Sequence, residues 1–165
     1  VLGARYQNAR TLIAIDLSNS QLALARELGA THTFNARDPD CLERVRELTK
    51  GGVEYVFEMA GSQRAMELAV KITRRGGTTV TAGLPHPSVM LPMSQVTLVA
   101  EERTLKGSYL GSCVPARDIP RYIEWYQAGR LPVNRLLSET LALEDINAGF
   151  DRLAGGETIR QVITL

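Results

Sequence analysis

The amino-acid sequence predicts an α/β fold built on a doubly wound parallel sheet with helices on both faces. Short apolar runs rich in β-branched residues alternate with segments whose apolar residues recur at helical spacing. Glycines stand between most of these segments and mark where one element ends and the next begins. Strands and helices that alternate in this way suit right-handed βαβ units, which place their strands parallel in one sheet.

The chain is organised around residues 11–29. The apolar run Thr11–Ile15 is too short for a buried helix, so we interpret it as a strand buried on both faces. The run ends at Asp16, and after a polar turn the apolar residues of 22–28 recur on one face of a predicted helix. Gly29 suits the left-handed position that ends such a helix.

Asp16 is the first candidate functional residue. An acidic residue at the carboxyl end of a buried parallel strand is where a dinucleotide-binding fold places its ribose-binding carboxylate. In that position the carboxylate would accept hydrogen bonds from the adenosine ribose hydroxyls and would repel a 2′-phosphate. The alternative is an aspartate that caps the following helix or forms a plain turn.

The alternation of strands and helices continues to residue 85. We expect strands over 31–34, 53–58 and 78–82, and helices over 39–49 and 65–72. Gly51-Gly52 ends the first of these helices and Arg75-Gly76-Gly77 ends the second. Residues 59–62 are predicted to form a tight turn from the middle strand into the second helix.

Beyond Pro85 the alternation is looser. A helix over 118–128 would have Asp118 as its N-cap and Pro120 in its first turn, where the missing N–H is harmless. The other expected elements are the last turns of a helix over 1–9, an irregular loop over 86–92, a short helix or turn over 95–100, strands over 104–110, 136–141 and 159–165, and a helix over 143–154.

Composition excludes several classes of protein. The 165 residues fit one domain, and 44% apolar and 22% charged residues are ordinary for a globular chain. A net charge of +1 without a basic block gives no nucleic-acid surface, and no apolar run approaches the roughly 20 residues that span a membrane. Cys41 and Cys113 lie outside any disulfide or zinc-ligand spacing, so we expect a reducing, cytoplasmic setting and no metal site.

Six blocks in register resemble the cofactor-binding domain (a Rossmann-type fold) of the zinc-type medium-chain alcohol dehydrogenases, and they cover essentially the whole chain. The blocks are IAID (13–16), ARELGATHTFNA (25–36), VFEMAG (56–61), GGTTVTAGLP (76–85), LKGSYLGS (105–112) and GETIRQVITL (156–165). A single block of this kind is weak evidence, whereas six in the same order are strong evidence.

The resemblance implies a set of NAD-binding residues. Asp16 would bind the adenosine ribose, Ala60 and Gly61 would lie near the adenosine or the nicotinamide ribose, and Arg160 would hold the pyrophosphate. The backbone groups offered to the nicotinamide carboxamide would come from Ala82, Gly83, Ser108 and Leu110. The alternatives are that Gly83 only permits a turn, that Ala60-Gly61 only allow close strand–helix packing, and that Arg160 is an exposed charge.

The sequence departs from the family at several points. The glycine-rich phosphate loop, the strand before it and the Cys/His/Cys zinc ligands would all precede Val1, so zinc is expected only in that missing half. A lysine expected soon after the ribose carboxylate is Gln21, which weakens the adenosine-ribose contacts without changing the NAD preference. His32 is interpreted as a surface or packed residue, and His86 as a loop residue that at most borders the cleft.

The missing strand would normally lie between the strands at 11–15 and 53–58. Its absence predicts two half-sheets with unpaired edges, and each unsatisfied backbone group costs about 1–3 kcal/mol. We therefore expect residues 1–165 to be the NAD-binding domain of a longer two-domain dehydrogenase, or another segment to fill the gap.

The implied function is hydride transfer between a nicotinamide and the carbon of a small alcohol or carbonyl substrate, in a dimer or tetramer of identical chains. This chain alone would carry no catalytic residue and no turnover. One alternative is a zinc-free quinone or enoyl reductase that uses NADPH, which Asp16 disfavours. The other is a non-catalytic dimerisation or nucleotide-binding module, with the apolar run Val96–Ala100 as a subunit contact or, alternatively, as ordinary core.

Overall fold

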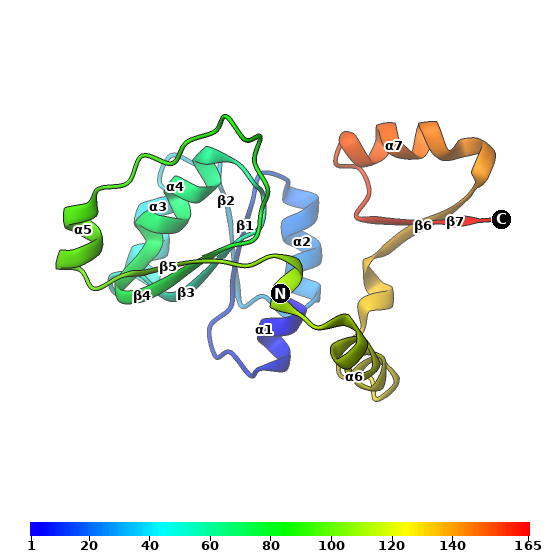
Figure 1. Ribbon diagram of the computed structural model, residues 1–165, viewed down its shortest axis with the longest axis horizontal. Coiled ribbons are helices and arrows are strands. Elements are labelled where there is room, and N and C mark those ends of the chain that lie inside the picture. Colours follow the sequence, from blue (N-terminus) through cyan, green and yellow to red (C-terminus); the bar gives the residue numbers. More distant parts are fainter. The chain divides into compact units, whose positions relative to one another are not determined.

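A computed structural model describes all residues from Val1 to Leu165. The chain divides into two compact units, one formed by Ile13–Val114 and the other by Val1–Leu12 together with Pro115–Leu165. Each unit is built from parallel strands and the helices that connect them (Figure 1). The α/β class predicted from the alternation of short apolar runs is therefore confirmed.

The Ile13–Val114 unit carries most of the predicted βαβ pattern. Its elements are β1 (Ile13–Asp16), α2 (Asn19–Glu27), β2 (His32–Asn35), α3 (Cys41–Leu48), β3 (Val53–Glu58), α4 (Gln63–Ile72), β4 (Thr73–Thr81), α5 (Gln95–Ala100), β5 (Thr104–Gly107) and the 3-10 turn η1 (Leu110–Ser112). The predicted helix or turn over 95–100 is a helix with the same bounds.

The second unit joins the first residues of the chain to the last. Its elements are α1 (Leu2–Tyr6), α6 (Pro115–Gln127), η2 (Val133–Leu136), β6 (Leu137–Ala142), η3 (Leu143–Asp145), α7 (Ile146–Ala154) and β7 (Arg160–Thr164). β6 and β7 form a parallel pair, and Glu139 on β6 accepts hydrogen bonds from Arg152 of α7 (2.8 Å) and Gln161 of β7 (2.7 Å).

An aromatic stack holds the N-terminal helix of this unit. The ring of Tyr6 lies 4.1 Å from that of Trp125 on α6, and the Arg130 guanidinium lies 4.6 Å from the Tyr6 ring centroid. Offset aromatic stacking and a cation over a ring each stabilise such contacts by about 0.5–1.5 kcal/mol. These contacts therefore join α1, at the start of the chain, to α6 and the residues that follow it.

The strands of the Ile13–Val114 unit form two separate sheets. One has the order β1-β2 and the other the order β3-β4-β5, and all neighbours are parallel. β1 and β3 each keep one edge without a strand partner, as the sequence predicts for a sheet that lacks the strand between them.

A common core holds the two sheets together without that strand. Phe34 of β2, Cys41 and Val45 of α3, and Ile72 of α4 form a buried cluster. Partly buried residues of both sheets pack against it, among them Ile13, Ile15, Val53 and Val56. The helices α3 and α4 thus cover residues of β1 and of β3 alike.

The unpaired strand β3 also exposes large aromatic side chains. Tyr55 is 65% exposed and Phe57 is 61% exposed. The two residues stand two positions apart on β3, so their side chains point to the same face of the strand. That face is open in this structure.

The structure corrects the expected start of α6. The helix begins at Pro115 rather than near Asp118, so Pro115 takes the first-turn position assigned to Pro120. Asp118 is not an N-cap; it is buried and paired with the guanidinium of Arg117 at 2.7 and 2.8 Å. Pro120 lies inside the helix, which forms without one of its backbone hydrogen bonds.

Two strand boundaries also differ from the expectation. β4 begins at Thr73, directly after α4, and it passes through Gly76 at a positive φ with an irregular register against β3. β5 ends at Gly107, three residues early, because the backbone turns into left-handed conformations from Leu110 onward.

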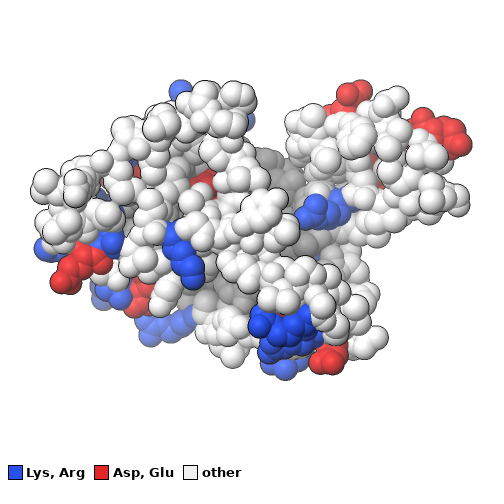
Figure 2. Space-filling model, viewed as in Figure 1, with Lys and Arg blue, Asp and Glu red and all other residues white.

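In the view of Figure 2 several Lys and Arg side chains lie together in the lower part, and most of the remaining surface is uncharged. No helix is long and apolar enough to cross a membrane.

We predict that residues 1–165 in isolation do not unfold as a cooperative monomer. The free edges of β1 and β3 leave strand N–H and C=O groups without partners, and domain stability is only about 5–15 kcal/mol. Calorimetry combined with light scattering would show a broad transition or a self-associated species. A single sharp transition from a monomer would contradict this expectation.

Candidate functional site

The predicted site residues of the Ile13–Val114 unit follow the carboxyl ends of its strands. Asp16 ends β1, Gly61 follows β3, Gly83 follows β4, and Ser108 and Leu110 follow β5. In open parallel sheets, ligands bind in the crevice outside these strand ends. The register places Glu58, Thr81 and Gly107 side by side as the last paired residues of β3, β4 and β5.

Glu58 organises the turns at this edge. Its side chain is only 5% exposed, and Oε1 accepts hydrogen bonds from the N–H groups of Ala60 (2.8 Å) and Gly61 (2.7 Å). Oε2 accepts from the Thr81 hydroxyl at 3.0 Å. A buried carboxylate must be hydrogen-bonded, and here every donor belongs to a segment of the candidate site.

Sequence reasoning missed Glu58, although the signal was present. The run VEYVFE ends in an acidic residue in the same way that the run before Asp16 does. The two residues differ in burial, since Asp16 is exposed whereas Glu58 is enclosed by its own turn.

The turns after β3 and β4 approach each other closely at two glycines. A Cβ at Gly83 would lie 2.1 Å from the Gly61 nitrogen and 2.9 Å from Glu58 Oε2. A Cβ at Gly61, where φ is +66°, would lie 2.9 Å from the Leu84 nitrogen. Gly83 is therefore required by lack of space, and Gly61 by space and conformation together. The close contact is between the two turns and not between a strand and a helix.

The segment after β5 is held to β4 and is then strained. The Ser108 N–H donates to the Thr81 carbonyl at 2.9 Å, which extends the β4–β5 pairing by one bond. Leu110, Gly111 and Ser112 then have φ values of 49°, 66° and 54°. Left-handed conformations of non-glycine residues cost about 1–2 kcal/mol each and cluster at functional sites. The Leu110 side chain is 71% exposed at this point.

Asp16 lies at the end of β1 with an exposed carboxylate. Its Oδ1 accepts from the Ser18 N–H at 2.8 Å, while the N-cap residue of α2 is Ser18 rather than Asp16. The helix-cap interpretation is therefore wrong, and Asp16 shapes the turn that precedes the helix. The carboxylate remains accessible to a hydroxyl donor.

Arg160 belongs to the other unit. It is the first residue of β7, where it pairs with Leu137 and is exposed. Its exposure agrees with the alternative that Arg160 is simply an exposed charge. It also leaves the guanidinium accessible to an anion.

The histidines and cysteines do not fit a zinc site. No group of three or more His, Cys, Asp or Glu side chains is placed to hold a metal ion. His32 is bound to the Thr31 hydroxyl and His86 to the Ser88 hydroxyl. Burial, with a smaller effect of Asp38, raises the pKa of the Cys41 thiol, so it is protonated at neutral pH. We assign no metal ligand to this chain.

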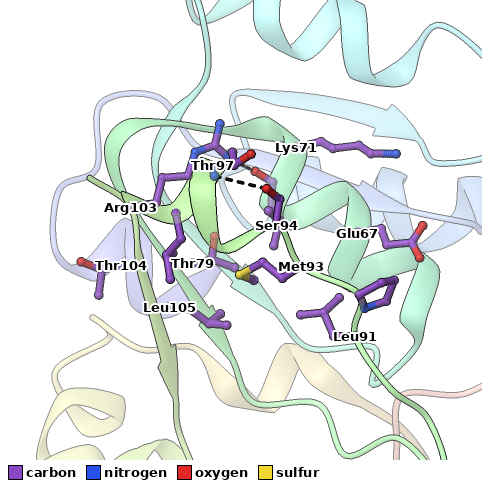
Figure 3. Close-up of a pocket in the computed structure, with 13 residues that line it drawn as sticks. Glu67, Lys71, Thr79, Leu91, Met93, Ser94, Thr97, Arg103, Thr104 and Leu105 are labelled. Carbon is purple, nitrogen blue, oxygen red and sulfur yellow. Dashed lines mark hydrogen bonds between the residues drawn. The ribbon is translucent and has the colours of Figure 1, made fainter. Parts of the chain in front are cut away.

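The structure also contains a cavity of about 200 Å³ (Figure 3). It is bounded by α4, the loop 91–94, α5 and β5, and none of the predicted site residues lines it. Arg103 at its wall is engaged by the Val70 carbonyl and by Glu101, and the Ser94 hydroxyl accepts from the Thr97 N–H at 3.3 Å. The cavity is therefore not the candidate site.

Parallel strands alternating with helices, with turns gathered at the strand ends, define an α/β domain of the kind found in dehydrogenases. A family model described as zinc-binding dehydrogenase matches residues 1–128. The chain belongs to this family and corresponds to the C-terminal part of the medium-chain alcohol dehydrogenases.

Relatives with known names agree over nearly the whole chain. Alcohol dehydrogenase 1 of Solanum tuberosum is 34% identical over 99% of the chain, and S-(hydroxymethyl)glutathione dehydrogenase of Paracoccus denitrificans is 30% identical over 98%. The matched region is only 43% and 45% of those proteins, so the chain spans less than half of their length.

Solved structures give the same result for the fold. A crystal structure of an alcohol dehydrogenase zinc-binding domain protein from Burkholderia ambifaria has a TM-score of 0.94 at 32% identity, and covers 99% of this chain and 44% of its own. Benzyl alcohol dehydrogenase of Acinetobacter calcoaceticus has a TM-score of 0.95 at 29% identity, over 99% of this chain and 45% of its own.

We predict that Gly83→Ala destabilises the polypeptide that contains these residues by about 2–3 kcal/mol, because the new Cβ meets backbone atoms that cannot move independently. Gly107→Ala is the matched control: it stands at the end of the neighbouring strand with open space around its Cβ position, and should change stability by about 0.5 kcal/mol or less. Urea unfolding would compare the two, and equal effects would refute the spatial argument.

Proposed function

We propose that this chain is the NAD(H)-binding part of an oxidoreductase that transfers hydride between a nicotinamide and the carbon of an alcohol or carbonyl compound. The observation that supports this most directly is the set of turns joined by Glu58 at the carboxyl ends of β3 and β4. Membership of a family that uses NAD(P) supports the same proposal. When bound, the nicotinamide supplies the hydride chemistry itself.

Different residues of the chain would bind different parts of the cofactor. The exposed carboxylate of Asp16 has the acceptor chemistry that ribose hydroxyls need, and its charge opposes a 2′-phosphate. Backbone groups of Ala82, Gly83, Ser108 and Leu110 would orient the carboxamide, and Ala60 and Gly61 would lie near a ribose. Arg160 would pair with the pyrophosphate.

The substrate oxygen would be handled by residues outside this chain. No cluster suited to a metal is present among residues 1–165, so we derive no step of the substrate chemistry from them. The proposed share of this chain is to bind the cofactor and to orient it.

A role in assembly is a second candidate function. Val96 and Val99 on α5 are 76% and 70% exposed, so the interpretation of 96–100 as ordinary core is wrong. β5 is exposed along its length and has a free edge, which can pair with another strand. Loss of NAD(H) affinity with retained dimers would favour this role over a part in an enzyme.

We predict that the whole polypeptide containing these residues binds NADH in preference to NADPH, and that Asp16→Asn weakens NADH by about tenfold or more. A lost hydrogen bond to a charged group is worth about 1.5–3 kcal/mol. The preference for NADH should shrink as well, since the charge that opposes the 2′-phosphate is gone. Asp38→Asn, which alters an exposed carboxylate beside Arg44, is the control. Nicotinamide fluorescence titrations report both constants.

We also predict that Arg160→Gln weakens NADH and ADP-ribose by the same factor, about tenfold, because both ligands carry the pyrophosphate. Nicotinamide riboside carries no phosphate and should bind unchanged. Arg46→Gln on α3 is the matched control for the loss of an exposed positive charge. Equal weakening of all three ligands would argue that Arg160 acts on folding and not on the pyrophosphate.

A further inference from the structure

We propose that Glu58 is a positioning residue that holds the turns 59–61 and 82–84 as one rigid receptor for the nicotinamide half of the cofactor. The inference rests on the proposed function, because it assigns a role toward a ligand that those turns would contact. Of the two riboses considered for Ala60 and Gly61, it takes the nicotinamide ribose. It goes beyond that function in naming a residue that touches no ligand itself.

The side chain of Glu58 joins two strand ends through charge-assisted hydrogen bonds. The amides of Ala60 and Gly61 come from the turn after β3, whereas the Thr81 hydroxyl comes from the end of β4. All three partners are neutral donors rather than a Lys or Arg side chain. Hydrogen bonds to an ionised acceptor are about twice as strong as neutral ones, so they hold these donors in one geometry.

The backbone of the same residue makes the second link. The Glu58 carbonyl accepts from the N–H groups of Ala82 (2.9 Å) and Gly83 (3.3 Å). One residue thus receives hydrogen bonds from both turns, through its side chain and its main chain. Gly83 lies so close to Gly61 and to Glu58 Oε2 that no side chain fits between the two turns.

The effect of Glu58 should be confined to one half of the ligand. Asp16, proposed for the adenosine ribose, stands on β1 in a different sheet and accepts its hydrogen bond from Ser18. Loosening the turns should therefore weaken nicotinamide binding and leave the adenosine half in place. A general loss of folding would weaken both halves together.

The test compares NADH with ADP in the whole polypeptide that contains these residues, because ADP lacks both the nicotinamide and its ribose. Glu58→Gln keeps the shape but removes the charge, and should weaken NADH by about tenfold while ADP changes by less than about twofold. Thr81→Val removes one donor and should weaken NADH by about fivefold, and Thr81→Ser should restore it. Glu54→Gln is the control, since Glu54 lies on the same strand, is exposed, and pairs only with Arg74 at the surface.

Amide hydrogen exchange without ligand provides an independent measurement. Exchange at Ala60 and Gly61 should be faster in Glu58→Gln and unchanged in Glu54→Gln. If Glu58→Gln does not fold, Thr81→Val and Thr81→Ser provide the same comparison of the two ligands.

The outcomes separate the two proposals. If the wild-type protein binds NADH, but Glu58→Gln and Thr81→Val bind NADH equally well or lose ADP to the same extent, the role of Glu58 alone is overturned. If the wild-type protein binds neither NADH nor ADP, the proposed function and this role are both overturned, even if exchange at Ala60 and Gly61 responds as expected.

Discussion

The buried carboxylate of Glu58 holds together the turns at the carboxyl ends of β3 and β4. Burying an isolated charge is costly, and Glu58 offsets that cost by taking neutral donors from the turns after β3 and β4. Its own carbonyl binds the second turn again. The position of Gly61 against Gly83, the path into α4 and the end of β4 all depend on this arrangement.

The second constraint is an interruption in the sheet. β1-β2 and β3-β4-β5 are two separate parallel sheets, and no strand connects them. What connects them is a core built from α3 and α4, with Val45 fully enclosed and Phe34 and Ile72 beside it. Side-chain packing is not directional, so it tolerates a missing strand better than the hydrogen-bond ladder does. The interruption leaves one edge of β1 and one edge of β3 without a strand partner. It is accompanied by the exposed rings of Tyr55 and Phe57 on β3.

The periodicity of apolar residues and the positions of glycines predicted the order and type of nearly every element, because a parallel α/β pattern repeats locally. The gap in the sheet was predicted from the resemblance to the alcohol dehydrogenase family. The predicted start of α6 was wrong, because Pro115 begins the helix and Asp118 is buried against Arg117 and does not cap it. The importance of Glu58, and the reason for glycine at 83, could not be predicted. Both depend on contacts between segments that are more than twenty residues apart. The ligand contacts of Arg160 and Asp16 stay predictions.

The stack of Tyr6 on Trp125 has an optical consequence. The chain has a single tryptophan, and it lies in the unit formed by the two ends of the sequence, while the Ile13–Val114 unit has none. Indole emission therefore reports on one unit only, and in particular on whether the first helix is seated on α6. Amide circular dichroism reports on both units at once. A difference between the emission and circular dichroism transitions during unfolding would show which of the two units unfolds first.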